Sequence, residues 1–455
     1  MKRLLLLVPV LLCACAAGPD YVRPDAPAQA AWRYAPENWK PAEPRDALPR
    51  GAWWAVFKDA QLDALAARAA SANLTIVAAE ARYRQAQAVT RQARAGLFPT
   101  LDAGLSVGRS RAPGATSTAR TSQLDFEAAW EPDLWGRVSR SIESGEALAQ
   151  ASAADVESLR LSVIGALAQN YFSLRIADAQ AQLLADTIAG YAQSLKVTQN
   201  RYVAGVAAKF DVVQAETQLR SAQAQLADLR LQRAQLENAI AVLVGEAPSA
   251  FSLVPAQALT PVPAIPLALP SALLERRPDV AVAERNVAAA NARIGVAHAA
   301  FFPSLSLTGT AGWRGASFSD LLTAPTRFWS LGAAAAQLLF DAGARQAVED
   351  QARAAYDNQV ALYRNTVLIA FQEVEDNLAA LKVLEEEIRF QEDAVRAARQ
   401  SLEMTLNRYK AGTASFLDVV AVQTIALGNE RTLATLRGRR LNAAVLLVKA
   451  LGGGW

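Results

Sequence analysis

The amino-acid sequence predicts an α+β membrane protein built from two tandem copies of one unit. Each copy would hold a helix, two strands and a long helical hairpin. Three observations predict this fold: motifs recur about 200 residues apart, short segments alternate polar and apolar residues, and long Ala-rich stretches carry apolar residues at three- and four-residue spacing. A fixed repeat indicates duplication, and periods of 2 and 3.6 residues indicate strands and helices.

Two pairs of aligned motifs support the duplication. The stretch "ARAGLFPTLDAGLSVG" at 93–108 matches "AHAAFFPSLSLTGTAG" at 297–312 with an offset of 204, and "NRYVAGVAAKFDVV" at 200–213 matches "NRYKAGTASFLDVV" at 407–420 with an offset of 207. Nearly equal offsets indicate a tandem duplication. The proline-rich residues 247–270 between the copies predict an extended linker.

Each copy should begin with a helix and continue into strands. Helical patterning over residues 61–97 and 272–300 stops at Pro99 and Pro303, because proline disfavours helix in the residue before it. Strand-like alternation follows. It covers residues 101–107, 124–130 and 305–313, whereas the fourth strand, near 329–339, fits either register. The loops at 109–120 and 314–327 have the Gly, Ser, Thr and Pro content of surface turns.

One face of these strands carries carboxylates and the other carries apolar side chains. Asp102, Asp125 and Glu127 alternate with leucine, phenylalanine and alanine. A membrane barrel needs this pattern, with lipid outside and water inside. We therefore expect these three acids to line the interior of a barrel.

Long helical hairpins complete each copy. Residues 139–200 would form a helix of roughly 93 Å, followed by a turn at Gly205 and a returning helix at 211–244. The second copy repeats this plan at 345–408, Gly412 and 418–451. Glycine between two helical stretches is a favourable left-handed stop.

The first residues predict export and a lipid anchor. Lys2 and Arg3 precede the apolar residues 4–12, which span only about 14 Å as a helix and are too short to cross a bilayer of about 30 Å. Residues 1–14 therefore predict a signal peptide. "LCAC" resembles a bacterial lipobox with Cys15 as the modified residue, which would carry N-palmitoyl and S-diacylglycerol groups. Two alternatives stay open: ordinary signal cleavage without a lipid, and cysteines that serve only as apolar filler.

Compartment and composition narrow the function. By resemblance to bacterial lipoproteins, Ala16 after the cysteine favours the outer membrane. The single histidine, His298, leaves no set of ligands or bases for a metal site or a histidine-based triad. The net charge of +3 is small for 455 residues, which argues against nucleic acid as a partner. We expect no catalytic residues, no metal and no other cofactor.

Four strands cannot close a membrane barrel alone, because natural barrels need about eight or more. An open edge in lipid would leave backbone groups unpaired. Three copies would give twelve strands; two would give eight, enough for only a narrow, filled barrel. The number of strands alone therefore favours three copies over two only weakly.

The chain resembles the TolC-like outer-membrane efflux proteins, in their NodT-type lipoprotein branch. The matching stretches are "CAAGPDYVRP", "ARAGLFPTL", "LWGR", "RRPDVAVAERNVAAANARIGVAHAAFFPSLSL", "RYKAG" and "ALGGGW". This resemblance implies a homotrimer with a twelve-stranded outer-membrane β-barrel that continues into a periplasmic α-helical barrel. It also implies a passive exit duct that works with a periplasmic membrane-fusion adaptor and an inner-membrane RND-type transporter.

The resemblance implies that the helical turns are the periplasmic tips that meet the adaptor. The tip residues are Arg201, Tyr202, Gly205, Arg408, Tyr409 and Gly412. Asp211 and Asp418 follow the two turns, where they could crowd the axis as a gate or simply cap the next helix. Relatives often carry an acid where this chain has Ala421, so the gate would rest on Leu417 and Arg408 contacts.

Two other functions compete with the duct. A lipid-anchored periplasmic helical-hairpin adaptor or scaffold would share the anchor and the hairpins, but it would not need four alternating strands. An enzyme could use Asp102, Asp125 and Glu127 as an acid–base pair. However, these acids lie on strand faces, and the sequence indicates no residues that would form a substrate pocket around them.

The expected organisation of the chain follows from these elements. It comprises a signal peptide at 1–14, a lipidated extended segment at 15–58, a first repeat at 59–246, the linker at 247–270, a second repeat at 271–451 and a tail at 452–455.

Overall fold

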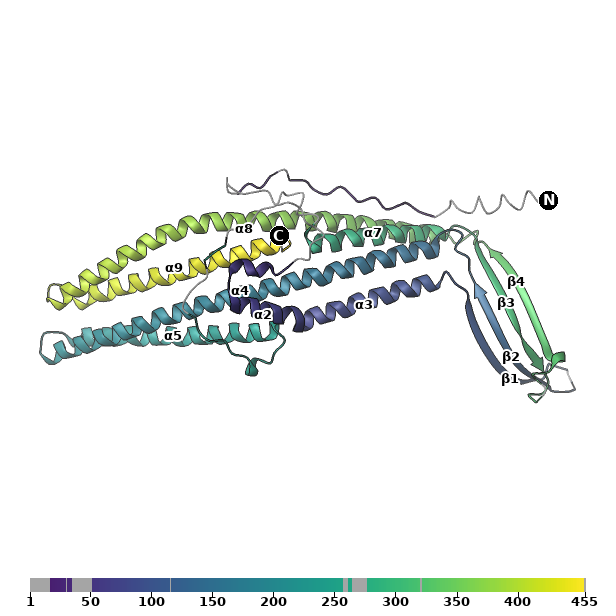
Figure 1. Ribbon diagram of the computed structural model, residues 1–455, viewed down its shortest axis with the longest axis horizontal. Helices are drawn as coiled ribbons and strands as arrows, with labels where there is room; N and C mark the ends of the chain where they lie inside the picture. The colour runs from purple at the N-terminus through teal and green to yellow at the C-terminus, as the bar shows by residue number, and fades with distance from the viewer. Residues whose placement is uncertain are drawn as a thin grey trace. The chain divides into compact units, whose positions relative to one another are not determined.

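The computed structural model, drawn in Figure 1, describes residues 17–29, 31–34, 51–114, 116–256, 261–263, 276–319 and 321–453. The chain forms two compact units. The strand unit comprises Met1–Ala26, Glu80–Ala154 and Ala281–Asn365, and the hairpin unit comprises Pro27–Ala79, Asp155–Val280 and Thr366–Trp455. Cys15 and the expected signal peptide lie outside the described residues.

The strand unit contains one antiparallel sheet whose strands follow the order β1–β2–β3–β4 (Figure 1). The strands are β1 Thr100–Ser110, β2 Ala119–Trp130, β3 Ser304–Gly315 and β4 Arg327–Ala336. Each copy supplies one hairpin, and pairing of β2 with β3 joins the copies, with Leu124 opposite Trp313. The predicted strands are confirmed, and the ambiguous fourth strand lies at 327–336. β1 and β4 form the two edges of the sheet.

Small side chains let the helices of the strand unit approach closely. Parts of α3 Leu74–Ala95, α4 Arg137–Val203, α7 Pro278–Ala299 and α8 Ala344–Lys410 belong to this unit. A Cβ at Gly145 would lie 3.2 Å from the Thr90 hydroxyl oxygen. Ala147, Ala288 and Ala289 form a buried cluster between α4 and α7. Alanine and glycine here give helix contacts without large side chains.

The first described residues are fixed to the helices of this unit. The Arg140 side chain is buried, and its Nε donates to the Ala17 carbonyl at 3.1 Å while its guanidinium pairs with Asp20 at 2.8 Å. Gly18 has a φ of +89°, and a Cβ there would lie 2.4 Å from Gly295 Cα. The chain that follows Cys15 is therefore held against α4 and α7.

The hairpin unit is built from antiparallel helices. It contains α2 Ala60–Ala72, α5 Lys209–Leu243 and α9 Phe416–Ala450, together with the later parts of α4 and α8. Short 3-10 turns occupy Trp53–Phe57 (η1) and Pro248–Ala250 (η2), with a third, Ala324–Thr326 (η3), in the strand unit. α5 returns along α4 and α9 returns along α8 (Figure 1), which confirms the predicted hairpins. None of the described helices is both long and apolar enough to cross a membrane.

Apolar stripes hold each hairpin together. Leu184 and Tyr191 of α4 pack with Leu219 and Leu229 of α5 in one buried cluster. A second cluster joins Leu384 and Ile388 of α8 to Leu436 of α9. Residues at helical spacing thus bury one face of each long helix.

The helical stretch predicted over 61–97 is confirmed, but it consists of two helices, α2 and α3, which are divided at Asn73. The Asn73 side-chain oxygen accepts from the N–H groups of Thr75 at 2.9 Å and Ile76 at 3.2 Å, which starts a new helix. Its amide also donates to the Leu243 carbonyl at 2.9 Å. A buried asparagine that caps α3 and binds the end of α5 therefore interrupts the helix.

Candidate functional site

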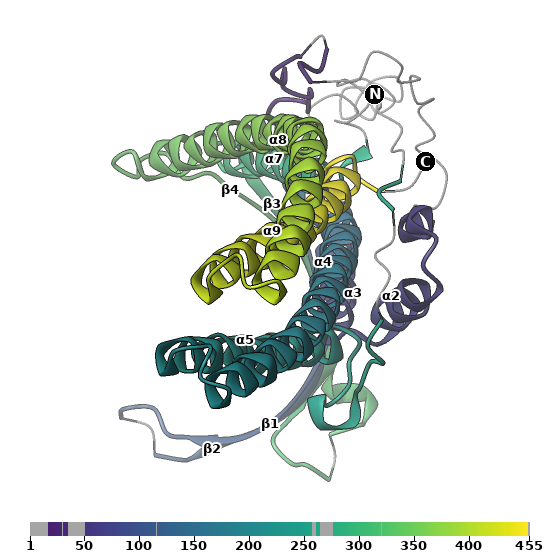
Figure 2. The same ribbon diagram turned by 90° about the vertical axis from the view of Figure 1, so that its left-hand side faces the viewer.

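The two hairpin turns have the same backbone geometry, and Figure 2 shows them from their own end. Gly205 has a φ of +75° and Gly412 a φ of +77°. The N–H of Val206 donates to the Arg201 carbonyl at 2.9 Å, and the N–H of Thr413 donates in the same way to Arg408 at 2.9 Å. These Schellman turns confirm the left-handed stops predicted at the glycines.

Acidic side chains cap the helices after both turns. The Asp418 carboxylate accepts from the Ser415 N–H at 2.9 Å and from the Ser415 hydroxyl at 2.7 Å. The hydroxyl bond, the backbone bond and Arg408 hold the pKa of Asp418 below its ordinary value. Asp211 accepts from the Ala208 N–H at 3.2 Å, but alanine has no hydroxyl that could add the second bond found at Asp418. Both carboxylates therefore lie three residues into a helix and bind back to its first N–H group, which is the helix-capping role that the sequence left open beside the gate.

Tyr409 links the two copies within the hairpin unit. Its hydroxyl lies 3.2 Å from the Thr198 hydroxyl, and its carbonyl accepts from the Arg201 guanidinium at 3.0 Å. That guanidinium also lies 4.8 Å from the centre of the Tyr409 ring, a cation–π distance. Tyr409 is 6% exposed. We call this contact of Thr198, Arg201 and Tyr409 the tyrosine clasp.

Two counterparts of the clasp residues in the other copy are more exposed. Tyr202, the counterpart of Tyr409, is 45% exposed, and Arg408, the counterpart of Arg201, is exposed. Leu417, just after the second turn, is 58% exposed. Arg408 donates to the Thr413 carbonyl of its own turn at 3.5 Å. The structure thus gathers the expected tip residues at two turns, but it gives equivalent residues of the two copies different surroundings.

The three expected lumen acids lie on one face of the sheet. Asp102 is directly opposite Glu127, and Asp125 is opposite Gly104 on one side and Gly312 on the other. Gln123 donates to Asp125 at 2.9 Å. Carboxylates that face each other across strands repel unless water or cations surround them, so this face suits a wet environment.

The opposite face of the sheet is apolar and exposed. Its edge strands present large side chains to the surroundings, with exposed fractions of 71% at Leu101, 69% at Val107, 74% at Trp329 and 81% at Leu331. So large an apolar surface indicates a membrane or protein contact.

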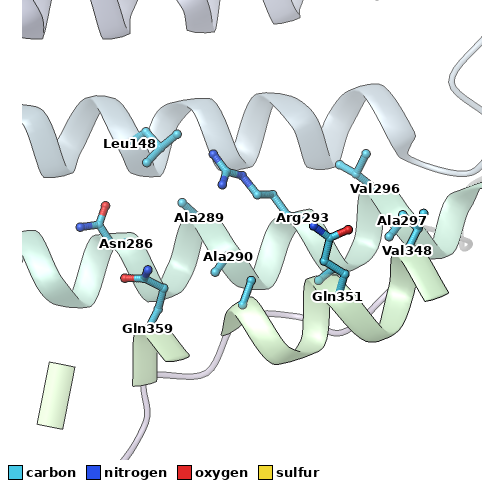
Figure 3. Close-up of a pocket in the computed structure, with 12 residues that line it drawn as sticks. Leu148, Asn286, Ala289, Ala290, Arg293, Val296, Ala297, Val348, Gln351 and Gln359 are labelled. Carbon is cyan, nitrogen blue, oxygen red and sulfur yellow. The ribbon is translucent and has the colours of Figure 1, made fainter. Parts of the chain in front are cut away.

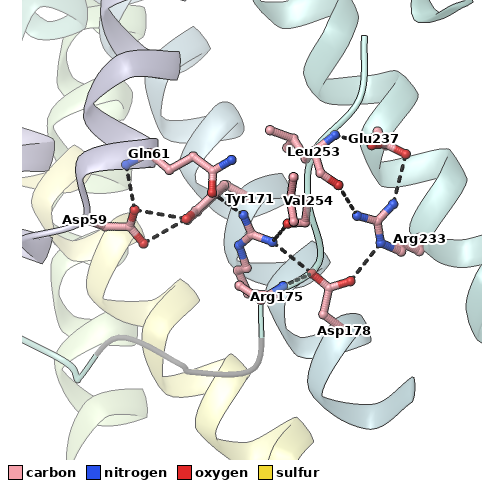
Figure 4. Close-up of polar contacts among 10 residues, drawn as sticks. Asp59, Gln61, Tyr171, Arg175, Asp178, Arg233, Glu237, Leu253 and Val254 are labelled. Atoms are coloured by element: carbon pink, nitrogen blue, oxygen red, sulfur yellow. Dashed lines mark hydrogen bonds and ion pairs between the residues drawn. The ribbon is translucent and has the colours of Figure 1, made fainter. Parts of the chain in front are cut away.

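A buried polar cluster in the hairpin unit was not predicted from the sequence (Figure 4). Arg175 of α4 pairs with Asp178 at 2.9 Å and donates to the Val254 carbonyl at 2.9 Å. Arg233 of α5 pairs with Asp178 at 2.7 Å and with Glu237 at 3.0 Å. The i,i+3 spacing of Arg175 and Asp178 within an apolar stretch was the one available signal.

This cluster fixes the start of the linker. The Leu253 N–H donates to Glu237, and the Leu253 carbonyl accepts from Arg233. Burial, opposed in part by Arg175, raises the pKa of Tyr171 to about 12, and its hydroxyl donates to Asp59 at 2.8 Å. Arg175, Asp178, Arg233 and Glu237 all take part in ion pairs, as the burial of charge requires, so the cluster stabilises the contact between α4, α5 and this segment.

A hollow of about 520 Å³ lies in the strand unit between α4, α7 and α8 (Figure 3). Arg293 is the charged side chain among its lining residues, which otherwise are alanines, amides and aliphatic groups. No carboxylate or histidine is among its described lining residues. Among the described residues, no group of three or more His, Cys, Asp or Glu could hold a metal ion.

The profile of the family described as "Outer membrane efflux protein" matches residues 65–246 and 269–453. The chain belongs to this family. It is 33% identical to the solvent efflux pump outer membrane protein SrpC of Pseudomonas putida, over 100% of this chain and 98% of that protein. It is 31% identical to the pyoverdine export outer membrane protein OpmQ of Pseudomonas aeruginosa, over 100% of this chain and 97% of that protein.

A solved structure agrees with this membership. The outer-membrane channel OprN superposes with a TM-score of 0.87 and 30% identity, over 97% of this chain and 100% of that one. These findings confirm the expected family, the α+β fold with tandem repeats, the role as an outer-membrane component of an efflux system, and the location in the outer membrane.

Proposed function

We propose that the chain is one subunit of a homotrimeric duct that carries substrates through the outer membrane. The observation that carries this proposal is the sheet, which has two open edges, one apolar face and one acidic face. Open backbone groups in lipid cost several kcal/mol each. Three copies would pair every edge and place the apolar face toward lipid.

The internal repeat supports a definite pairing between subunits. β2 pairs with β3 across the boundary between copies. β3 corresponds to β1 with the offset of 204, and β4 corresponds to β2 with the offset of 207. Applied to the β2–β3 register, these offsets predict how β4 of one subunit pairs with β1 of the next. Ala333 then lies opposite Val107 and Ala335 opposite Leu105. Both pairs join apolar face to apolar face, as a barrel in lipid requires.

We propose a lipid anchor on Cys15 as well. Residues just after it are held on α4 by Arg140 and on α7 by Asn291, whose amide donates to the Pro19 carbonyl, so the acyl chains would tether the strand unit at the membrane. A single acyl chain binds membranes only marginally, whereas two or more acyl chains anchor a protein stably. The acylated cysteine carries no catalytic role, and we propose that the duct performs no reaction of its own.

The hairpin turns are the proposed contact surface for a periplasmic membrane-fusion adaptor, itself coupled to an inner-membrane RND-type transporter. The glycine turns at 205 and 412, which end the two hairpins, support this assignment. The alternative is a lipid-anchored periplasmic scaffold, in which the apolar face of the sheet would stay exposed to water.

We propose a resting gate at the same end, formed by Asp211, Asp418, Leu417 and Arg408. The exposure of Leu417 leaves its side chain available to neighbours. Asp418→Ala or Leu417→Ser should raise the resting conductance of the duct. Unchanged conductance for both variants in planar bilayers would remove these residues from the gate.

Planar-bilayer recording also tests the duct itself. The purified protein should give discrete conductance steps that prefer cations, because Asp102, Asp125 and Glu127 would face the water. The triple variant Asp102→Asn, Asp125→Asn, Glu127→Gln should keep the steps and lower the cation preference. Protein that binds the bilayer yet gives no steps would favour the scaffold.

A further inference from the structure

We propose that the tyrosine clasp is repeated across each subunit boundary, where Tyr202 of one subunit packs against Arg408 and Thr405 of the partner subunit. This inference rests on the homotrimer proposed above and deepens it, because it names the residues that join neighbouring hairpin units. The contact is incomplete in one chain and complete only between two.

Both copies carry the full set of clasp residues. The pattern Thr-x-x-Arg-Tyr occurs at 198–202 and again at 405–409, with the offset of 207 that relates the two copies. Within the chain only one combination is made among the described residues: Thr198 and Arg201 of the first copy hold Tyr409 of the second. The first copy therefore keeps a tyrosine outside any clasp, and the second copy keeps an arginine and a threonine outside any clasp.

Burial follows this division. Thr198 is fully buried and Tyr409 is 6% exposed, whereas Tyr202 is 45% exposed and Arg408 is exposed. The Arg408 guanidinium reaches the Thr413 carbonyl at 3.5 Å, the long limit of a hydrogen bond. An exposed phenol ring and an exposed guanidinium are the two parts of a cation–π pair.

A ring of subunits brings these remaining halves together. Within one subunit, the first copy gives its arginine and threonine to the tyrosine of the second copy. If the same order continues around the ring, the second copy gives its arginine and threonine to the first copy of the partner subunit. Such head-to-tail contacts close when the rotation completes a circle. A trimer then holds clasps within subunits and equivalent clasps between them.

The two kinds of boundary differ in the side chains around the tyrosine. Inside the chain, Tyr409 packs with Ala215, Phe416, Val419 and Val420 in one buried cluster. At the proposed boundary between subunits, the offset of 207 places Val422, Lys209, Val212 and Val213 in the corresponding positions.

Lys209 thus replaces Phe416 at the proposed subunit boundary, and Val422 replaces Ala215. A phenylalanine side chain buries about 150–250 Å², which is more than the two methyl groups that valine adds to alanine. Less apolar area is therefore buried there, and buried apolar area is the main source of stability. The boundary between subunits is therefore the weaker of the two.

Cross-linking between introduced cysteines tests the clasp. The variant Arg408→Cys/Tyr202→Cys, treated in membranes with ethanediyl bis-methanethiosulfonate, should give covalent dimers and trimers in denaturing gels. The matched variant Arg201→Cys/Tyr409→Cys should react within one chain and keep the monomer mass. The unsubstituted chain, treated in the same way, controls for cross-linking through the natural cysteines Cys13 and Cys15.

The outcomes separate this inference from the proposed function. Monomers only from Arg408→Cys/Tyr202→Cys, in protein whose native mass is that of a trimer, would overturn the clasp and leave the duct. A monomeric native mass would overturn both.

A second variant tests the weaker boundary without any reagent. Lys209→Phe copies Phe416 into the other boundary, so it should raise the temperature at which detergent-resistant trimers dissociate. Lys209→Ala, which removes the charge without adding a ring, should raise it far less. Equal dissociation temperatures for Lys209→Phe and the unsubstituted protein would contradict the inferred boundary.

Discussion

At the scale of single residues, the surroundings decide what a repeated residue does. Arg201 and Arg408 occupy the same place in the two copies. Arg201 binds Tyr409 of the other copy, whereas Arg408 lies over its own turn. A sequence motif shows that both arginines belong to turns, but it cannot show which one has a partner in the same chain.

The cap at Asp418 should make the start of α9 sensitive to acid. The Ser415 hydroxyl and N–H hold the pKa of Asp418 below 3.8. A lowered pKa means that the folded state prefers the ionised carboxylate. Its stabilisation is therefore present above pH 3.8 and is lost as the pH falls through the lower folded value.

Hydrogen exchange of the first amides of α9, corrected for intrinsic rates, measures this effect. Protection should fall as the pH drops below about 4. Asp418→Asn should start with lower protection and show little further change over that range. Parallel curves for the two proteins would mean that the carboxylate does not stabilise this turn.

At the scale of elements, the strands and hairpins could be predicted because their side chains repeat with clear periods. The sheet acids alternate with apolar residues, and the turn glycines separate two helical stretches. The break at Asn73 could not be predicted, because an asparagine between two helical patterns caps a helix only if its other contacts permit. Its bond to the Leu243 carbonyl joins residues far apart in sequence.

The same reason hid the tyrosine clasp and the Arg175 cluster. Each joins residues from different helices, and no local period reports such a contact. The sequence did identify Arg201 and Tyr409 as tip residues, and the structure adds that they bind one another.

The crossing of α9 with α4 depends on one glycine. A Cβ at Gly438 would lie 1.9 Å from the Ile176 Cδ1. Gly438→Ala should therefore destabilise the hairpin unit by about 1–3 kcal/mol, the usual cost of overpacking. Gly428→Ala in the same helix meets nothing within 4 Å and should stabilise by up to about 1 kcal/mol. Thermal unfolding followed by circular dichroism compares the two, and equal shifts would contradict the close crossing.

The strand register between subunits can be tested by direct disulfide formation. Opposite residues on antiparallel strands have Cβ atoms about 4.5–5.5 Å apart, so a small shift brings them to the distance of about 3.5–4.5 Å that a disulfide needs. Val107→Cys/Ala333→Cys should give covalent trimers on oxidation. Leu105→Cys/Ala333→Cys, shifted by two residues, should form them much more slowly. The reverse order would place the register two residues away from the one inferred.

At the scale of the whole molecule, the duplication makes one chain supply two of the positions around a ring. Family membership and the superposition on OprN agree with a duct. The relatives' names mention solvents and pyoverdine, so the duct fold does not specify its cargo. Cargo choice is better assigned to the transporter that delivers it.

The most direct test of the central claim is the native mass of the mature protein extracted in mild detergent. We predict a trimer in which each chain carries an acylated Cys15. A stable lipidated monomer would leave β1 and β4 with open edges, contradict the barrel and make the periplasmic scaffold the better account.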